Sequence, residues 1–346
     1  MIQKSLHPLW TIVVVLLFVV CTTATAQNNK HIRPLVTDTP MVHDPVMAYE
    51  NGQYYLYSTG RRLQLMTSPN RRTWTLHRQG AMPAIPQWTH DSVPGFKEHV
   101  WAPDIIRWRD RWWLAYSCST FGKNTSAIGL MSVDSLAHYS QWRDEGCIVA
   151  SQRHRDDWNA IDPNFVVGED GQLWLTFGSF WDGIQIVRLD SSLHIARGNR
   201  PTTIARRRGK GTEVESNPTS KYAGTNAIEA PFIFRHNDYY YLFVSWDYCC
   251  RGNKSTYRVV VGRSNSVEGP YLDRNGTPMT EGGGTPFFKG DKHLLEAAGH
   301  CAAYHFDDGD LFVCHGYSLQ HGGASILIQR PILWDADDWP CIGNTN

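Results

Sequence analysis

Short apolar and aromatic runs, separated by polar turn residues, cover the chain from residue 40 onward. Between residues 226 and 245 an acid, Glu229, stands just before Ala230-Pro231, and two apolar runs follow with a polar turn between them. Runs of this length, rich in β-branched and aromatic residues and bounded by Asn, Asp and Gly, predict strands joined by tight turns. No long stretch after residue 26 has the 3.6-residue period of a helix, so the sequence predicts an all-β protein.

The arrangement of a polar residue, a strand, a turn and a second strand recurs five times. Its copies lie at residues 43–58, 101–117, 160–179, 226–245 and 299–316. Prolines at positions 45, 103, 163 and 231 mark the first four copies, and His300 takes the corresponding place in the fifth. The residues left between copies provide room for two more strands each, and four strands recurring five times predict a five-bladed β-propeller. We attribute the long period to loops at 78–99, 200–225 and 275–298.

The inner strands of a propeller blade line the central axis, so polar residues at the start of these strands converge there. The residues at these places are Asp44, Asp104, Asp162, Glu229 and His300. Acids gathered in one cavity repel each other when ionised, so their pKa values separate and one acid stays protonated near neutral pH. Inverting glycoside hydrolysis requires such a pair, an acid and a base about 6.5–9.5 Å apart with a water between them.

Composition narrows the choice of partners. The chain has 33 Lys and Arg residues against 33 Asp and Glu residues, which argues against nucleic acid as a partner because phosphate backbones select basic surfaces. The basic run 206–210 is surrounded by Gly, Thr, Ser and Pro, and we interpret it as a solvated loop.

The first 26 residues resemble a secretory signal, with Lys4, an apolar stretch from Leu9 to Val20 and a cleavage site at Ala24-Thr25-Ala26. The apolar stretch is short for a membrane span. We therefore expect residues 1–26 to be removed, residues 27–346 to form a single propeller domain, and the protein to be secreted or periplasmic, with no membrane span after cleavage. A lipoprotein formed through Cys21 is the weaker alternative, because Val20 before it is not small.

Seven cysteines remain after residue 26, and this odd number leaves at least one thiol unpaired in a monomer. Their spacing does not suggest zinc. The adjacent pair Cys249-Cys250 is open to two interpretations, a vicinal disulfide or two small side chains that pack as thiols, and we favour packing.

Five motifs in order along the chain resemble glycoside hydrolase family 43, most closely its endo-1,5-α-L-arabinanases, over residues 40–335. These motifs are His43-Asp44-Pro45, Trp101-Ala102-Pro103-Asp104, Asn159-Ala160-Ile161-Asp162-Pro163-Asn164, Ala227-Ile228-Glu229-Ala230-Pro231 and Gly299-His300. Segments 246–257 and 261–271 also resemble arabinanases and favour them over the xylosidases of the family. The resemblance implies an inverting hydrolase of α-1,5-linked L-arabinan or arabino-oligosaccharides.

The resemblance also implies roles for individual residues. Asp44 would be the general base that activates water, Glu229 the general acid, and Asp162 a third carboxylate that raises the pKa of the acid and orients it. Asp104 follows its proline instead of preceding it, so we assign it to blade architecture. By the same resemblance, substrate contacts would come from the catalytic Asp44 and Asp162 and from nine further residues: Trp101, Phe121, Gly122, Asn159, Ala160, Ile161, Ser179, Phe180 and Trp181.

His300 is implied as a ligand, directly or through water, of one ion on the axis, commonly calcium in this family. Because calcium prefers oxygen ligands, the alternative is a histidine hydrogen-bonded to a catalytic carboxylate. No organic cofactor is expected, and we expect a monomer.

Two other functions stay open. One is an exo-acting α-L-arabinofuranosidase or β-xylosidase of the same family, since the loops at 78–99 and 275–298 could close one end of a substrate groove. The other is a propeller that binds glycans without cleaving them. Three acids in one cavity count against the second, because a binding module has no need of concentrated like charges.

Overall fold

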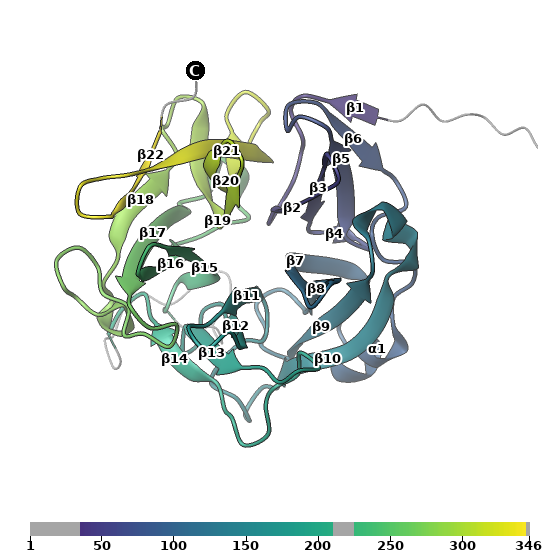
Figure 1. Ribbon diagram of the computed structural model, residues 1–346, viewed down its shortest axis with the longest axis horizontal. Coiled ribbons are helices and arrows are strands. Elements are labelled where there is room, and N and C mark those ends of the chain that lie inside the picture. Colours follow the sequence, from purple (N-terminus) through teal and green to yellow (C-terminus); the bar gives the residue numbers. More distant parts are fainter. Residues whose placement is uncertain (1–34, 210–224, 344–346) are drawn as a thin grey trace, which may run out of the picture. The chain divides into compact units, whose positions relative to one another are not determined.

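Five antiparallel sheets stand around a common axis as the blades of a five-bladed β-propeller (Figure 1). The computed structural model describes residues 35–209 and 225–343 of the chain. The predicted fold is confirmed. The predicted signal peptide at 1–26 lies outside the described residues.

Each blade is formed by one continuous section of the chain, apart from one short strand. Blade 1 contains β1 (Leu35–Thr37), β2 (Val46–Glu50), β3 (Gln53–Ser58), β5 (Gln64–Ser68) and β6 (Trp74–His77). Blade 2 contains β7 (His99–Trp108), β8 (Arg111–Cys118), β9 (Ser126–Val133) and β10 (Arg143–Ser151), and β4 (Gly60–Arg61) adds to its inner edge.

The other three blades have four strands each within the described residues. Blade 3 contains β11 (Asn164–Val167), β12 (Leu173–Phe177), β13 (Ile184–Arg188) and β14 (Thr202–Ala205). Blade 4 contains β15 (Ile228–His236), β16 (Tyr239–Trp246), β17 (Arg258–Ser264) and β18 (Thr285–Lys289). Blade 5 contains β19 (Leu295–Phe306), β20 (Gly309–Ser318), β21 (Ala324–Trp334) and β22 (Pro340–Ile342).

Helical structure is sparse in the described residues. It consists of the α-helix α1 (Gln87–Ser92) and the 3-10 helices η1 (Leu136–Gln141), η2 (Gly252–Lys254) and η3 (Met279–Glu281). In this part of the chain no helix has both the length and the apolar character needed to cross a bilayer.

Two of the segments that we predicted as loops contain strands. β14 lies in 200–225 and β18 in 275–298, and each is the outermost strand of its blade. Outer strands are short and half exposed, so they lack the apolar pattern that marks an inner strand. The C-terminal residues after Asp338 likewise supply the outer strand β22 of blade 5.

The hydrophobic core lies between neighbouring blades. One cluster joins residues of blades 2 and 3, such as Leu130 and Leu175, and another joins blades 3 and 4, such as Ile186 and Leu242. A third joins Met47 of blade 1 to Val313 of blade 5. Each sheet buries both faces against its neighbours, which explains why the inner strands are apolar at nearly every position.

One backbone feature repeats in all five blades at the start of the inner strand. The residue there has a positive φ: 54° at Asp44, 40° at Ala102, 58° at Asp162, 54° at Ala230 and 50° at His300. This left-handed conformation is rare for residues other than glycine. The equivalent positions are therefore these five, which corrects our alignment: Glu229 lies one residue before its position and Asp104 two residues after.

The backbone N–H of each of these residues donates a hydrogen bond to the preceding blade. Ala102 donates to Thr59 Oγ1 (2.8 Å), Asp162 to Ser117 Oγ (3.0 Å), Ala230 to Asp162 Oδ2 (3.1 Å) and His300 to Ser245 Oγ (2.8 Å). Asp44 donates to His315 Nδ1 of blade 5 (3.1 Å), so the series runs around the whole ring. Positions that converge on the axis are thus fixed by side chains of the neighbouring blade.

Candidate active site

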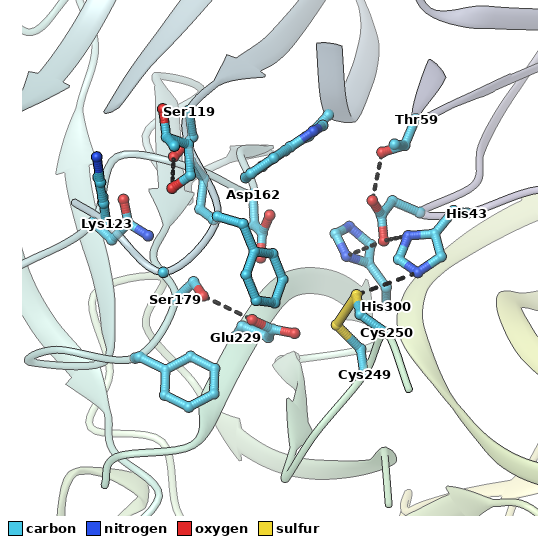
Figure 2. A pocket seen from close by; sticks show the side chains of 18 of the residues that line it. His43, Thr59, Ser119, Lys123, Asp162, Ser179, Glu229, Cys249, Cys250 and His300 are labelled. Carbon is cyan, nitrogen blue, oxygen red and sulfur yellow. Dashed lines mark hydrogen bonds and ion pairs between the residues drawn. A yellow bond between two sulfur atoms is a disulfide. The ribbon is translucent and has the colours of Figure 1, made fainter. Parts of the chain in front are cut away.

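Residues from all five blades line one cavity of about 490 Å³. Figure 2 shows the side chains of Asp162, Glu229 and His300 around it, supplied by blades 3, 4 and 5. Asp44 of blade 1 and Trp101 of blade 2 also line the cavity.

The structure brings nearly all of the predicted site residues together. The cavity is lined by Asp44, Trp101, Phe121, Gly122, Asn159, Ile161, Asp162, Ser179, Phe180, Trp181, Glu229 and His300. Ala160 is absent from this lining, since it is fully buried and its N–H donates to Ser151 Oγ (2.9 Å). Ala160 therefore shapes the cavity through its neighbours and does not face the cavity itself.

The sequence analysis missed several residues of the lining: His43, Thr59, His99, Ser119, Thr120, Lys123, Tyr248, Cys249 and Cys250. Signals existed for some of them. His43 and the segment that contains Tyr248 and the two cysteines belong to motifs that we quoted, and Thr59 follows the second strand of its repeat, where a hydroxyl recurs in other blades. Ser119, Thr120 and Lys123 lie in the loop between β8 and β9, and His99 is the first residue of β7.

Asp44 is enclosed by hydrogen-bond donors. Its Oδ1 lies 2.9 Å from His43 Nδ1 and 3.0 Å from His300 Nδ1, and its Oδ2 accepts the hydroxyl of Thr59 (2.5 Å). Burial by itself would raise the pKa of Asp44, but the charge of His300 and the hydrogen bonds from both rings hold that pKa well below its ordinary range. Asp44 is therefore ionised at neutral pH.

Glu229 and Asp162 have the opposite protonation behaviour. Burial raises the pKa of Glu229, although the hydroxyl of Ser179 donates to its Oε2 (2.7 Å) and lowers the pKa in part. Burial also raises the pKa of Asp162 well above its ordinary range, the charge of His300 opposes this rise, and the charges of Glu229 and Asp44 add to it. The cavity thus holds an ionised carboxylate and two acids that favour the protonated form.

His300 is hydrogen-bonded to Asp44, which is the alternative that we had left open for this residue. Burial lowers its pKa, but Asp44, Asp162 and Glu229 outweigh this and raise the pKa to about 9, so the ring is positively charged near neutral pH. Among the described residues His300 belongs to no group of three or more candidate metal ligands. Its chemistry therefore fits calcium poorly except through Nε2 and water, and calcium stays a prediction.

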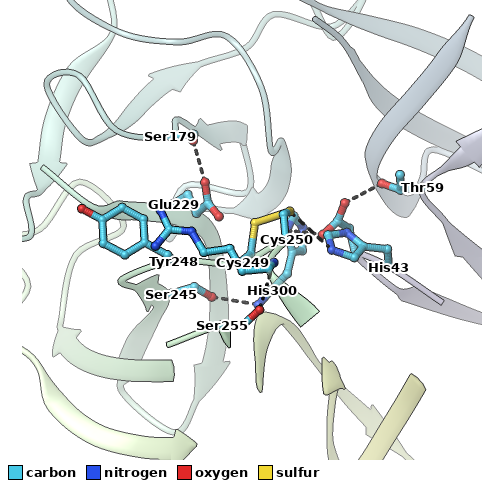
Figure 3. Close-up of a disulfide and its surroundings, with 12 residues drawn as sticks. His43, Thr59, Ser179, Glu229, Ser245, Tyr248, Cys249, Cys250, Ser255 and His300 are labelled. Carbon is cyan, nitrogen blue, oxygen red and sulfur yellow. Dashed lines mark hydrogen bonds and ion pairs between the residues drawn. A yellow bond between two sulfur atoms is a disulfide. The ribbon is translucent and has the colours of Figure 1, made fainter. Parts of the chain in front are cut away.

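Cys249 and Cys250 form a vicinal disulfide in the wall of the cavity (Figure 3). This corrects our expectation that the pair would pack as free thiols. The backbone turns sharply here, with a φ of 65° at Cys250, and the N–H of Cys250 donates to the hydroxyl of Tyr317 (2.6 Å). The disulfide goes with this sharp turn of the backbone. Two cysteines that are merely adjacent in a sequence could equally well be free thiols.

Asp104 lies outside the cavity lining, as its position after the proline suggested. Its Oδ2 accepts the N–H of Phe165 (2.6 Å) and the amide of Asn164 (3.2 Å), so it joins blade 2 to blade 3. Burial raises its pKa to about 7. Asp104 therefore belongs to the blade architecture.

Comparison of the sequence with known proteins shows the family to which the chain belongs. The sequence pattern described as "Glycosyl hydrolases family 43" matches residues 36–340. An extracellular exo-α-(1→5)-L-arabinofuranosidase of Cellvibrio japonicus is 41% identical over 303 residues, covering 86% of this chain and 85% of that protein. An extracellular endo-α-(1→5)-L-arabinanase of Bacillus subtilis is 36% identical over 304 residues, covering 87% of each.

Solved structures agree with the fold. An exo-1,5-α-L-arabinanase from a bovine ruminal metagenomic library is 48% identical, with a TM-score of 0.82 over 89% of this chain and 98% of that one. The α-L-arabinanase of Cellvibrio cellulosa in complex with arabinohexaose is 38% identical, with a TM-score of 0.79 over 88% of this chain and 96% of that one.

Proposed function

Since the chain belongs to glycosyl hydrolases family 43, we propose that it cleaves α-1,5-linked L-arabinan by an inverting mechanism, with Asp44 as general base and Glu229 as general acid. One observation carries the proposal: a single cavity holds Asp44 with a lowered pKa and Glu229 with a raised pKa. A base and an acid with separated pKa values are what one-step inversion requires. Relatives of this chain named for arabinan support the substrate.

The hydrogen bonds indicate which oxygens take part. A carboxylate has about four acceptor positions, two on each oxygen. On Asp44 the two imidazoles occupy Oδ1 and Thr59 occupies one position on Oδ2, so Oδ2 retains room to accept a proton from water. On Glu229 the Ser179 hydroxyl donates to Oε2, and we propose that the other oxygen, Oε1, carries the acidic proton that goes to the glycosidic oxygen.

In the proposed reaction the water loses its proton to Asp44 and attacks the anomeric carbon while Glu229 protonates the departing oxygen. Burial and the charge of Asp44 raise the pKa of Glu229 and so keep it protonated. Asp162 orients this acid, because its Oδ2 accepts the N–H of Ala230, the residue that follows Glu229. The aromatic side chains of Trp101, Phe121 and Trp181 provide surfaces for sugar rings.

Exo cleavage is a second candidate, because two of the similar proteins, at 41% and 48% identity, carry exo names, although more of the similar proteins carry endo names. The loops that we expected to close the groove contribute little: His99 is the sole lining residue from 78–99 within the described part of the chain, and 275–298 supplies none. Chromatography of early products from linear arabinan separates the two modes, since arabinose or one short oligosaccharide from the outset indicates exo cleavage.

The inverting mechanism is tested by NMR of products at early times. Cleavage of an α-linkage should first release the β-anomer, and mutarotation should follow. Appearance of the α-anomer first would refute inversion, and no release of arabinose or its oligomers from linear or branched arabinan would refute the substrate.

Secretion and an axial calcium ion also belong to the proposal. Relatives named extracellular support secretion, and a mature protein whose N-terminus is Gln27 would agree with it. Calcium would bind near His300 through water, and treatment with a chelator followed by activity and melting measurements tests this. Unchanged activity and Tm after metal removal would argue against the ion.

A further inference from the structure

Hydrogen bonds link Asp44, His315, Tyr317 and His43, and the donor in each bond can be assigned from the groups that take part. The first member of this series after Asp44 is His315, which is fully buried in β20. Burial lowers the pKa of His315 well below its ordinary range, so the ring is neutral. Its Nδ1 accepts the N–H of Asp44 (3.1 Å), and a neutral ring with an acceptor at Nδ1 must carry its proton on Nε2.

The next member is the hydroxyl of Tyr317, also in β20. It lies 3.3 Å from His315 Nε2, which donates to it, and it accepts the N–H of Cys250 at 2.6 Å. Two donors occupy the acceptor capacity of the phenol oxygen, so its own proton must go elsewhere. Its remaining side-chain partners are His43 Nε2, at 3.1 Å, and Ser255, and we assign the proton to the bond with His43.

His43 is the last member. If Nε2 accepts the proton of Tyr317, the ring proton lies on Nδ1, which is 2.9 Å from Asp44 Oδ1. The opposite tautomer would place a lone pair against the carboxylate. A doubly protonated ring would bring a third donor to the Tyr317 oxygen, or would have to donate to the disulfide sulfur Cys250 Sγ at 3.7 Å, which is a weak acceptor.

We propose that Tyr317 is a positioning residue for the general base: its hydroxyl keeps the proton of His43 on Nδ1, so that His43 donates to Asp44. Tyr317 itself is absent from the cavity lining, so it acts through His43 and not on the sugar. The claim that Tyr317 influences the general base rests on the proposed function. The claim that His43 carries its proton on Nδ1 does not.

Several other groups lie close to these hydrogen-bonded residues and would contribute to the pH dependence of activity. Asp44 is also faced by Thr59 after β3 and by His300 from β19. Cys250 Sγ lies 3.7 Å from His43 Nε2, Ser255 lies beside Tyr317, and the carboxylates of Glu229 and Asp162 share the cavity.

The first test measures the imidazole nitrogens of His43 by NMR in ¹⁵N-histidine-labelled protein, with His43→Asn used for assignment. The wild type should show the Nδ1–H tautomer, and Tyr317→Phe should lose that preference. An Nε2–H or fully charged ring in the wild type, or an unchanged tautomer in Tyr317→Phe, would overturn the inference. This outcome is independent of any substrate, so it separates the inference from the proposed function.

The second test is a double-mutant cycle on arabinan with full pH profiles. Tyr317→Phe and His43→Ala should each lower kcat/KM about tenfold and move the acid limb up by about one pH unit, the scale of one hydrogen bond to a charged group. The double variant should fall no further than His43→Ala, because Tyr317 acts through His43. Multiplying effects or an unmoved acid limb would overturn the proposal.

Two variants serve as controls. His43→Asn keeps a donor toward Asp44 that needs no orienting partner, so its loss of activity should be smaller than that of His43→Ala, and adding Tyr317→Phe to it should lower activity little further. Tyr271→Phe removes another buried hydroxyl, which donates to Val267 O (2.8 Å) outside the cavity lining, and it should leave the pH profile unchanged. If Tyr317→Phe fails to fold, the contrast between His43→Ala and His43→Asn decides, and equal losses would contradict the proposal.

Discussion

The two sides of the cavity bury their carboxylates equally and yet protonate them differently. Asp44 is 7% exposed, Asp162 6% and Glu229 8%, but the pKa of Asp44 is lowered while those of Asp162 and Glu229 are raised. Burial acts in the same direction on all three. The difference lies in the donors among the described residues: two imidazoles and a hydroxyl on Asp44, against hydroxyls without an imidazole on Glu229 and one backbone N–H on Asp162.

The position of one cation sharpens this contrast. His300 lowers the pKa of all three acids, yet it makes direct contact with Asp44 alone. The comparison teaches that ionic partners placed at contact distance, more than depth of burial, divide a set of similar acids into a base and an acid.

The largest effect should come from neutralising each side in turn. Asp44→Asn and Glu229→Gln should each lower hydrolysis of linear arabinan by about 10²–10⁴-fold. A substrate with a good leaving group needs no acid, so an aryl arabino-oligosaccharide should restore Glu229→Gln far more than Asp44→Asn. Steady-state kinetics on both substrates measure this. If the aryl substrate restored both variants equally, the assignment of Glu229 as the acid and Asp44 as the base would be wrong.

Removing the positive charge of His300 should make the pKa of Asp44 more similar to those of Glu229 and Asp162. His300→Gln keeps a polar side chain but loses the charge that holds Asp44 ionised, so the pKa of Asp44 should rise and the acid limb of the rate profile should move to higher pH. We expect a loss of about 10–100-fold in kcat/KM, the scale of a hydrogen bond between charged groups. A profile that keeps its acid limb would show that donors other than His300 control Asp44.

The raised pKa of Asp162 should make the stability of the folded protein depend on pH. Because the pKa of Asp162 is raised in the folded protein, its contribution to stability is complete below its unfolded pKa and is lost as pH rises through the folded value. Asp162→Asn removes this loss and can still accept the N–H of Ala230. Its Tm should equal that of the wild type near pH 4 and exceed it by about 2–4 °C near pH 8. A gain independent of pH would contradict the raised pKa.

The smallest effect should come from Ser179→Ala, which removes the hydroxyl that donates to Glu229. This bond lowers the pKa of Glu229, so its loss should move the alkaline limb upward by about half a pH unit and reduce kcat a few-fold. Thr59→Val on the other side is the matched change, and it should move the acid limb instead.

The sequence predicted the propeller and most of the cavity because both depend on a repeated local pattern. Asp44, Asp162 and His300 occupy the same place in three repeats; the aligned prolines revealed it for the two acids, and the similar strand pattern for His300. Asp104 and Glu229 deviate from that place by two residues and one residue, an offset that Pro103 and Pro231 already indicate in the sequence and that the backbone conformation at Ala102 and Ala230 makes explicit.

The partners of these residues could not be predicted in the same way. Thr59, His315 and Tyr317 reach Asp44 or His43 from other strands, and the pairing depends on strand register and on how blade 5 meets blade 1. The outer strands β14 and β18 were missed because half-exposed edges carry little apolar signal.

The junction between the first and last blades also bears on biosynthesis. Although β1 stays in blade 1, residues 40–42 pair antiparallel with β21 of blade 5, with Met41 opposite Ile326 and hydrogen bonds from Val42 N–H to Ser325 O and from Leu327 N–H to Pro40 O. The same junction brings His300 and His315 to Asp44. A ribosome delivers blade 1 first and blade 5 last. The base therefore acquires its partners when the final blade docks, and an incomplete nascent chain carries Asp44 without the cation that makes it a base.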